Sequence, residues 1–300
     1  MGTISLKKRI KEGFFLLDGG MGTELIARGA QVGICNEYLN IKSPDVVFEI
    51  HKEYFRAGSD AVLTNTFGAN KYCLGRHGLE KRVVQINLTA AELAGRAGGQ
   101  EHYVLGDIGP SGDFLEPLGN LKAADLRAAY VEQAGALLGA GVDAFIIETI
   151  SSIDEMEIIM EAVKSVSAAL PVFVSMAFNK VGEDFRTMMG VDVDSAVGKA
   201  VAAGADAVGF NCGNMELDDY VELARQYVSA VKALGQETVV YAEPNAGKPQ
   251  LGDKGVFYKV SPEDFAAAAE RIYLAGVNII GGCCGTGPVH IKALAEKLRK

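Results

Sequence analysis

Three cysteines stand in two glycine-rich segments, each of which follows an apolar run. Cys283 and Cys284 are adjacent and flanked by glycines, whereas Cys212 follows the run 208–210 and precedes a glycine. Adjacent cysteines rarely bond to each other because disulfide geometry is demanding, and flanking glycines let the backbone turn so that both sulfurs converge. Three thiolates with one open position are typical of a catalytic zinc site. The alternative is three buried, inert cysteines, but the repeated context favours zinc.

Two acidic residues occupy positions at which a carboxylate could bind a substrate. Glu148 ends the apolar run 145–147, where burial of a carboxylate without a partner would be costly. We therefore expect it to hold a cation such as a substrate ammonium; the alternative is that it caps the following helix. Asp18 precedes a glycine-rich turn, 19–23, that leads into a helix. Exposed N–H groups at a helix start can receive a carboxylate, although a purely structural turn is the alternative.

The remaining cysteines and the histidines lack the spacing of metal ligands. We expect Cys35 and Cys73 to be packing or loop residues, and the histidines to be structural. The predicted zinc site is then all sulfur apart from one exchangeable ligand. Three thiolates would keep a fourth, substrate thiolate electron-rich while the metal lowers its pKa from about 8.5. The expected chemistry is activation of a thiol rather than of water.

The elements that must position these residues follow from one repeated phrase. A pattern of Ala, Gly, any residue and Asp or Asn recurs at 57–61, 140–144, 203–207 and 275–279. Each copy follows a helical pattern and precedes an apolar run. The glycine acts as a helix stop, and the apolar run is typical of a buried parallel strand. Repetition of helix, stop and strand is the pattern of βα units.

Counting in chain order predicts eight strands. They cover 14–20, 60–66, 103–109, 143–149, 172–178, 207–212, 239–245 and 279–285. The helices between them include 44–57, 123–140, 152–168, 192–203, 218–234 and 262–275, with cap signals at Ser43, Asp192 and Ser261. Eight alternating units predict an α/β fold, a (β/α)8 TIM barrel, with a doubly wound sheet as the alternative. With no long linker, residues 1–300 are expected to form a single domain.

A barrel of this kind carries its active site at the C-terminal ends of its strands. The sequence places polar residues and cysteines there: Asp18, Thr64, Asn65, Thr66, Asp107, Glu148, Thr149, Asn211, Cys212, Glu243, Asn245, Cys283 and Cys284. The predicted sixth and eighth strands supply the three cysteines, so these converge if the strand count is right. The fold prediction and the zinc prediction therefore support each other.

Composition limits the class of protein. The 300 residues are 49% hydrophobic and carry a net charge of −9, which permits a large core and argues against a nucleic-acid partner. The sequence contains neither an apolar run of transmembrane length nor a signal-peptide core, so we expect no membrane association. Five cysteines without a disulfide spacing pattern predict a reducing, cytoplasmic location.

Taken together, these motifs resemble the zinc-dependent homocysteine S-methyltransferases. The shared motifs lie at 16–23, 64–67, 148–149, 211–212 and 281–285. Within that family the chain most resembles the homocysteine-binding module of cobalamin-dependent methionine synthase, at 106–112, 116–119, 244–247 and 277–280. The resemblance implies Cys212, Cys283 and Cys284 as zinc ligands. It also implies that Glu148 and the Asp18 loop hold the amino-acid end of homocysteine. The expected substrate contacts are Asp18, Gly19, Gly20, Met21, Thr64, Glu148 and Asn211.

The resemblance implies that a methyl group moves from a methylcorrinoid onto the zinc-bound thiolate of L-homocysteine, which gives methionine. Methylcobalamin or a related corrinoid would come from a partner protein or from domains absent from this chain. Betaine is disfavoured because the chain has no Trp for an aromatic cage, and Thr149 stands where betaine-using relatives carry Tyr. S-methylmethionine and S-adenosylmethionine stay open as donors. A non-catalytic zinc-binding or thiol-binding subunit is the alternative from another class.

Overall fold

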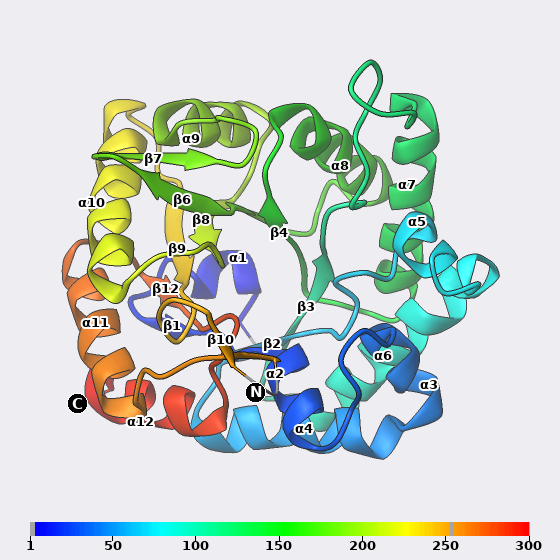
Figure 1. The fold of residues 1–300 in the computed structure, drawn as a ribbon, viewed down its shortest axis with the longest axis horizontal. Helices are drawn as coiled ribbons and strands as arrows, with labels where there is room; N and C mark the ends of the chain where they lie inside the picture. The colour runs from blue at the N-terminus through cyan, green and yellow to red at the C-terminus, as the bar shows by residue number, and fades with distance from the viewer. Residues whose placement is uncertain (1–3, 253–254, 300) are drawn as a thin grey trace.

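Eight parallel strands form one sheet that curls into a barrel surrounded by helices (Figure 1). The computed structural model describes residues 4–252 and 255–299. Around the sheet the order is β1 (Phe15–Leu16), β12 (Ile279–Ile280), β9 (Val239–Glu243), β8 (Ala207–Asn211), β5 (Val172–Met176), β4 (Ala144–Ile150), β3 (Tyr103–Ile108) and β2 (Ala61–Leu63). Neighbouring strands pair in parallel. The predicted (β/α)8 barrel is confirmed.

The two ends of the sheet, β1 and β2, approach each other through Asp60. Its backbone N–H donates to the carbonyl oxygen of Leu16 at 2.7 Å, and its carboxylate accepts from the N–H of Leu16 at 2.8 Å. At the C-terminal end of β2, the N–H of Leu63 donates to the carboxylate of Asp18 at 3.1 Å. These bonds bring the loop after β1 beside the end of β2, where the predicted site lies.

The six outer helices for which ranges were predicted match those ranges to within two residues at each end. The outer helices are α4 (Pro44–Ala57), α6 (Val83–Gly98), α7 (Ala123–Gly139), α8 (Ile153–Val166), α9 (Val193–Ala202), α10 (Leu217–Ala233), α11 (Pro262–Leu274) and α12 (Pro288–Leu298), with α6 and α12 additional to the ranges given above. The four predicted stop glycines have φ between 83° and 113°, the left-handed region that favours glycine. Asp192 and Ser261 cap their helices as predicted, whereas Ser43 makes no side-chain capping bond to the described residues.

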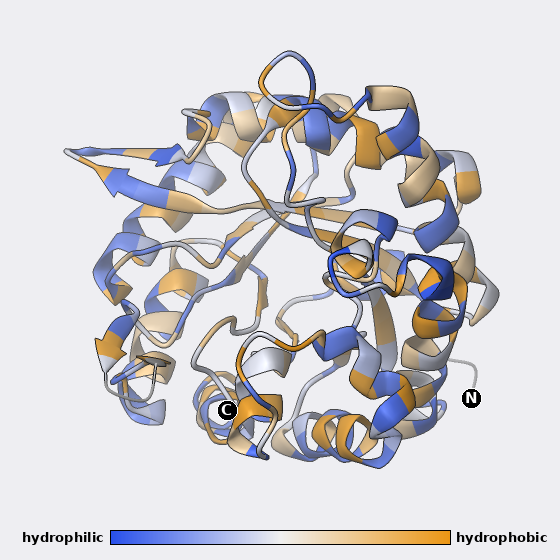
Figure 2. Ribbon diagram, turned by 45° about the vertical axis from the view of Figure 1, so that its right-hand side comes forward, coloured by the Kyte–Doolittle hydropathy of each residue, from blue (hydrophilic) through white to orange (hydrophobic). Residues whose placement is uncertain are grey.

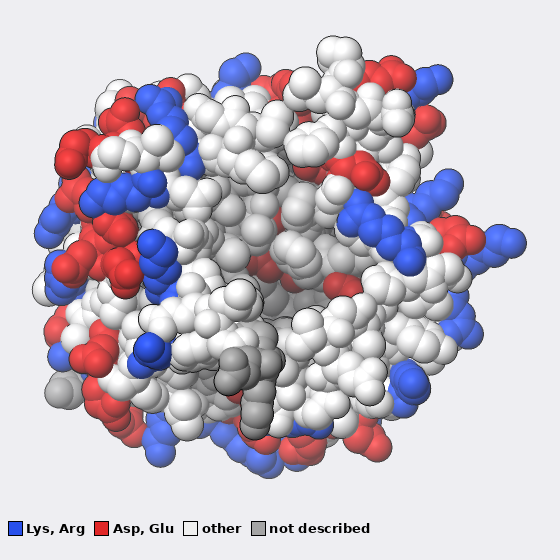
Figure 3. All heavy atoms as spheres, viewed as in Figure 1, with Lys and Arg blue, Asp and Glu red and all other residues white. Residues whose placement is uncertain are grey.

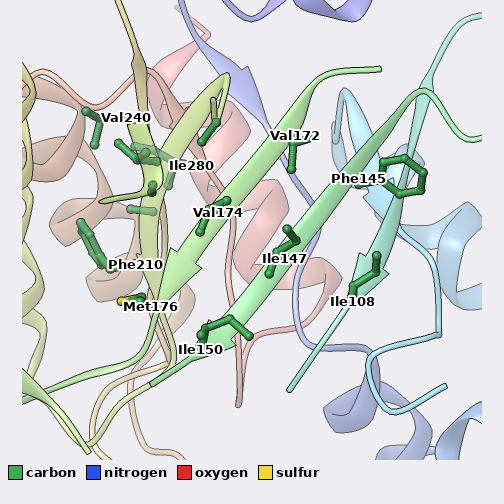
Figure 4. Packing of buried hydrophobic residues seen from close by; sticks show 14 of the residues in the cluster. Ile108, Phe145, Ile147, Ile150, Val172, Val174, Met176, Phe210, Val240 and Ile280 are labelled. Atoms are coloured by element: carbon green, nitrogen blue, oxygen red, sulfur yellow. The ribbon is translucent and has the colours of Figure 1, made fainter. Parts of the chain in front are cut away.

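Apolar side chains form two layers, one inside the barrel and one between the strands and the helices. Figure 2 shows that the barrel strands are rich in hydrophobic residues, while the helices carry both kinds. Strand side chains such as Ile147, Val174 and Phe210 belong to the outer cluster (Figure 4). In the inner cluster, Leu6 and Ile10, on and beside the short helix α1 (Leu6–Arg9), pack with alternate strand residues such as Ile146. The N-terminal end of the barrel is thus filled, and the opposite end is free to carry the site.

Several predicted strands are too long at their C-terminal ends. The first stops at Leu16 and the last at Ile280, and the glycine-rich residues beyond them form loops. Close backbone packing requires this: a Cβ on Gly281 would lie 2.9 Å from the carbonyl oxygen of Asp18. Two hairpins were not predicted. They are β6 (Phe178–Val181) with β7 (Asp184–Thr187), and β10 (Gln250–Gly252) with β11 (Gly255–Phe257).

Short helices complete the connections around the barrel: α2 (Met21–Ala27), α3 (Leu39–Lys42) and α5 (Lys71–Gly75). Helix α2 follows Gly19 and Gly20 but begins at Met21, inside the range 19–23 that the sequence assigned to the turn. Across residues 4–252 and 255–299, no helix has the combination of length and apolar character needed to cross a membrane.

Candidate active site

A cavity of about 720 Å³ opens at the C-terminal end of the barrel. Figure 3 shows this hollow at the centre of the face, with acidic groups inside, while most charged side chains lie at the periphery. The predicted site residues that line it are Asp18, Gly19, Gly20, Met21, Thr64, Glu148, Cys212, Cys283 and Cys284. Asn211 is the exception, because it is 1% exposed and is not part of the cavity wall.

The three cysteine sulfurs converge on one wall of this cavity. All three Sγ atoms lie within 4.8 Å of one another, and those of Cys283 and Cys284 are 3.9 Å apart. A tetrahedral zinc with Zn–S bonds of about 2.3 Å requires sulfurs roughly 3.8 Å apart. The cluster can therefore hold a metal ion, and the separation of the Cys283 and Cys284 sulfurs fits zinc. Cys35 and Cys73 lie elsewhere and contact Glu37 and the carbonyl of Ser111 respectively.

The end of β8 presents the first of these sulfurs. Cys212 has a φ of 55°, a left-handed conformation that is uncommon for a residue with a side chain. Its N–H donates to the carbonyl of Glu243 at 3.3 Å, and its carbonyl accepts from the hydroxyl of Tyr220 on α10 at 2.6 Å. The sharp turn is thus fixed from both sides, and the thiol is directed away from the strand and into the cavity.

The adjacent pair of cysteines is held by the loop after β9. The N–H of Cys283 donates to the carbonyl of Pro244 at 2.9 Å, and that of Cys284 donates to the side-chain oxygen of Asn245 at 3.0 Å. The amide nitrogen of Asn245 donates in turn to the carbonyl of Gly213 at 2.8 Å. Asn245 therefore ties the two cysteine segments together, a role that its position at a predicted strand end does not reveal.

The thiols differ in acidity because they share hydrogen bonds. Those from Cys283 and Cys284 lower the pKa of Cys212 well below that of an ordinary thiol. Donation to Cys212 raises the pKa of Cys283, and burial adds to this effect. The shared hydrogen bonds thus favour the thiolate form of Cys212, which is the protonation state that a metal ligand requires.

Four carboxylates line the same cavity: Asp18, Asp107, Glu148 and Glu243. Burial, and then repulsion from Cys212, raises the pKa of Glu148 to about 7. Burial, followed by repulsion from Glu148 and Glu243, raises the pKa of Asp107 well above its usual range. No Lys, Arg or His is among the described residues that line the cavity. A cationic group on a ligand would relieve the repulsion among these carboxylates and favour their ionised form.

Two of these carboxylates were not predicted as ligand contacts. Asp107 Oδ1 and Glu243 Oε2 are buried and have no hydrogen-bond partner among the described residues. Buried polar atoms are normally paired, so these two oxygens are candidates to contact a ligand. Their positions at strand ends were the available signal, but the sequence does not show which strand-end side chains remain unpartnered.

Glu148 does not cap the helix that follows it. The N-cap of α8 is Ser152, whose hydroxyl accepts from the N–H of Glu155. The Glu148 carboxylate instead accepts from the amide nitrogen of Asn211 at 2.6 Å and lines the cavity. The geometry therefore favours the ligand-contact interpretation over the capping alternative.

The loop after β1 completes the cavity. The N–H of Gly20 already donates to the hydroxyl of Thr286 at 3.1 Å, so it is not free for a ligand. A Cβ on Gly19 would lie 2.7 Å from the same hydroxyl, which explains the need for glycine there. Thr64 Oγ1 accepts from the N–H of Asp107 at 3.0 Å. Thr64 therefore also ties the ends of β2 and β3 together.

Comparison with known proteins agrees with this geometry. The family model described as homocysteine S-methyltransferase matches residues 15–298. The methionine synthase of Mycobacterium tuberculosis is 34% identical over 300 residues, which cover 93% of this chain, and that of Mycobacterium leprae is 32% identical over 94%. The chain spans 24% of the length of each of these relatives.

Solved structures share the fold. The homocysteine methyltransferase MmuM from Escherichia coli, in its metallated form, superimposes with a TM-score of 0.79 at 23% identity, covering 99% of this chain and all of that one. The carboxyl transferase domain of Rhizobium etli pyruvate carboxylase covers 99% of this chain and 51% of its own with a TM-score of 0.54 at 11% identity, so other chemistry uses a related barrel. The family match extends over nearly the whole chain and includes every cysteine of the cluster. The chain therefore belongs to the homocysteine S-methyltransferase family of enzymes.

Proposed function

We propose that this chain holds zinc through Cys212, Cys283 and Cys284 and transfers a methyl group onto the thiolate of L-homocysteine, giving methionine. One observation carries the proposal: a three-sulfur cluster and an unneutralised acidic cluster face the same cavity. Homocysteine has a thiol at one end and an ammonium at the other, and so it matches both clusters.

Zinc and the carboxylates would act on different ends of homocysteine. Zinc, when bound, would lower the pKa of the substrate thiol so that it reacts as a thiolate. Glu148, with Asp107 and Glu243 beside it, would hold the ammonium and so fix where the sulfur lies. The thiolate then attacks the methyl carbon, a carbon–sulfur bond forms, and the donor departs with the electron pair of the bond that breaks. Orientation of this kind reduces the entropic part of the activation barrier.

A methylcorrinoid is the donor that we propose first. Its support is the similarity to two methionine synthases at 34% and 32% identity. The corrinoid would be presented by a partner protein or by a corrinoid domain.

A sulfonium donor is the second candidate, and a specific observation favours it. Phe67, Phe257 and Tyr258 line the cavity, and aromatic faces attract methylated cations. S-methylmethionine and S-adenosylmethionine both carry such a centre. Phe67 lies far from the adjacent pair Phe257 and Tyr258 in the sequence, so no local motif indicates that these side chains meet at the cavity.

A reducing, cytoplasmic location is part of the proposal. All five cysteines are free, and three of them form the cluster. Oxidation of any of these three would remove a thiolate from the site.

A transfer assay with isotope-labelled donors tests the proposal. Zinc-loaded protein is incubated with homocysteine and either methylcobalamin, S-methylmethionine or S-adenosylmethionine, and labelled methionine is measured by mass spectrometry. We expect transfer from methylcobalamin and its loss in Cys283→Ala. Transfer from a sulfonium alone would replace the corrinoid as donor. Homocysteine binding without transfer from any donor would support the non-catalytic thiol-binding alternative.

A further inference from the structure

The side-chain amide of Asn211 lies between the cysteine cluster and the carboxylate of Glu148. Its nitrogen donates to Glu148 Oε2 at 2.6 Å and to Thr149 Oγ1 at 2.7 Å, and it lies 3.8 Å from Cys283 Sγ. Its oxygen accepts from the N–H of Thr149 and from the hydroxyl of Ser175, both at 2.8 Å. An amide offers two donor hydrogens and two acceptor lone pairs, so these contacts use its full capacity.

This saturation changes the role that the sequence predicted for Asn211. A side chain that is 1% exposed and fully bonded to protein atoms has no group left for a substrate. We infer instead that Asn211 is a positioning residue that couples metal occupancy to the affinity of the ammonium subsite. The inference rests on the proposed function, because it takes the amino end of homocysteine to lie beside Glu148.

The backbone on either side of the amide supports this role. Thr149 and Cys212 have φ values of 61° and 55°, left-handed conformations that a residue with a side chain adopts at a cost. Each follows a residue of this network directly: Thr149 follows Glu148, and Cys212 follows Asn211. Bonds to the N–H and hydroxyl of Thr149 hold the first turn in place. The orientation of Glu148 and that of Cys212 therefore depend on one planar group.

The coupling has a defined direction. An ion held by the three sulfurs would fix Cys212 and Cys283, which both adjoin Asn211, and so fix the amide that orients Glu148. Without the ion, these two side chains have more freedom and Glu148 is less well placed. By linkage, the amino-acid end should bind more tightly when the metal is present.

The test uses L-norvaline, which matches homocysteine in shape but has a methyl group in place of the thiol. It cannot coordinate the metal, so any effect of zinc on its affinity must pass through the protein. Calorimetry would compare zinc-loaded and zinc-stripped protein. For the wild type we expect zinc to tighten norvaline binding by about fivefold or more, the usual range for coupling between sites.

Ser175→Ala removes the hydroxyl that fixes the oxygen of Asn211. Ser175 is fully buried and contributes nothing to the cavity wall. In this variant the ratio of the two norvaline affinities should fall toward one, while zinc affinity, measured by chelator competition, changes less than about twofold. Ser165→Ala on α8, whose hydroxyl donates to the carbonyl of Ala162, is the control and should keep the wild-type ratio.

The outcomes separate the two claims. If the wild type binds homocysteine but zinc leaves norvaline affinity unchanged, or if Ser175→Ala keeps the full ratio, the coupling is wrong and the proposed function stands. If the wild type binds no homocysteine, both fall. Should Ser175→Ala fail to fold, Thr149→Val, which removes the hydroxyl that accepts from Asn211, must show the same loss of ratio.

Discussion

The N–H of Gly282 donates to the carbonyl oxygen of Asp18 at 2.8 Å. This bond joins the loop that carries two cysteines to the loop that opens the chain's first βα unit. The loop of the cysteine cluster and the loop that carries Asp18 are thus bonded directly to each other. A substrate that bridges them would contact loops from both ends of the sequence.

The cysteine cluster predicts zinc binding that a single substitution removes. Purified wild-type protein should contain about one zinc per chain, as a three-sulfur site implies. Cys283→Ala should lose most of it, because two sulfurs cannot hold the ion against competition. Cys73→Ala is the matched control, since Cys73 lies outside the cavity, and it should keep its zinc. Elemental analysis showing equal zinc in both variants would remove the ligand assignment.

Glu148 and Glu155 offer a matched pair of buried or half-buried acids with different roles. A charge-assisted bond to the substrate contributes roughly 1.5–3 kcal/mol, so Glu148→Gln should weaken homocysteine binding about tenfold or more with little change in melting temperature. Glu155 accepts from the N–H and hydroxyl of Ser111. Glu155→Gln should therefore lower the melting temperature and leave affinity almost unchanged. The reverse order in the two variants would place Glu148 in the scaffold.

Asp107 predicts a pH dependence of stability in the metal-free protein. Its pKa is raised by burial and by Glu148, so the folded state holds its proton more tightly than the unfolded state does. Stability from this group is present at low pH and is lost as the pH rises through the raised pKa. The loss should therefore begin above the ordinary carboxyl pKa of about 4 and continue as the pH rises toward the raised pKa.

Asp107→Asn tests this directly, because the amide keeps the shape and cannot ionise. The unfolding free energy of this variant in urea, minus that of wild type, should increase by on the order of 1 kcal/mol or more from pH 5 to pH 8. A difference that stays constant over this range would mean that folding does not raise the pKa of Asp107.

The sequence predicts most of the barrel because its signals are local. Glycine stops such as Gly58 and Gly276 and the apolar runs after them need no tertiary information, and both glycines have the expected left-handed φ. The strand count then brings Cys212 together with Cys283, although these residues lie far apart in the sequence. Strand lengths were less well predicted, because close packing against neighbouring backbone, as at Gly281, decides where a strand becomes a loop.

The parts of the site that were missed depend on long-range contacts. Tyr258 reaches the cavity from beside the β10–β11 hairpin and packs against Gly285, and nothing local in the sequence indicates this. Asn211 was predicted to contact the substrate because of its motif. The structure shows that its amide is used by Glu148, Thr149 and Ser175, and such saturation cannot be read from one segment.

Direct contact between the substrate sulfur and the metal is the central claim, and X-ray absorption at the zinc edge tests it most directly. Without substrate, the spectrum should fit three sulfurs at about 2.3 Å and one lighter ligand. With saturating homocysteine it should fit four sulfurs at that distance, while L-norvaline should leave the count at three. If calorimetry shows homocysteine bound and the spectrum still contains three sulfurs, the thiol does not reach the metal, and the account of its activation is wrong.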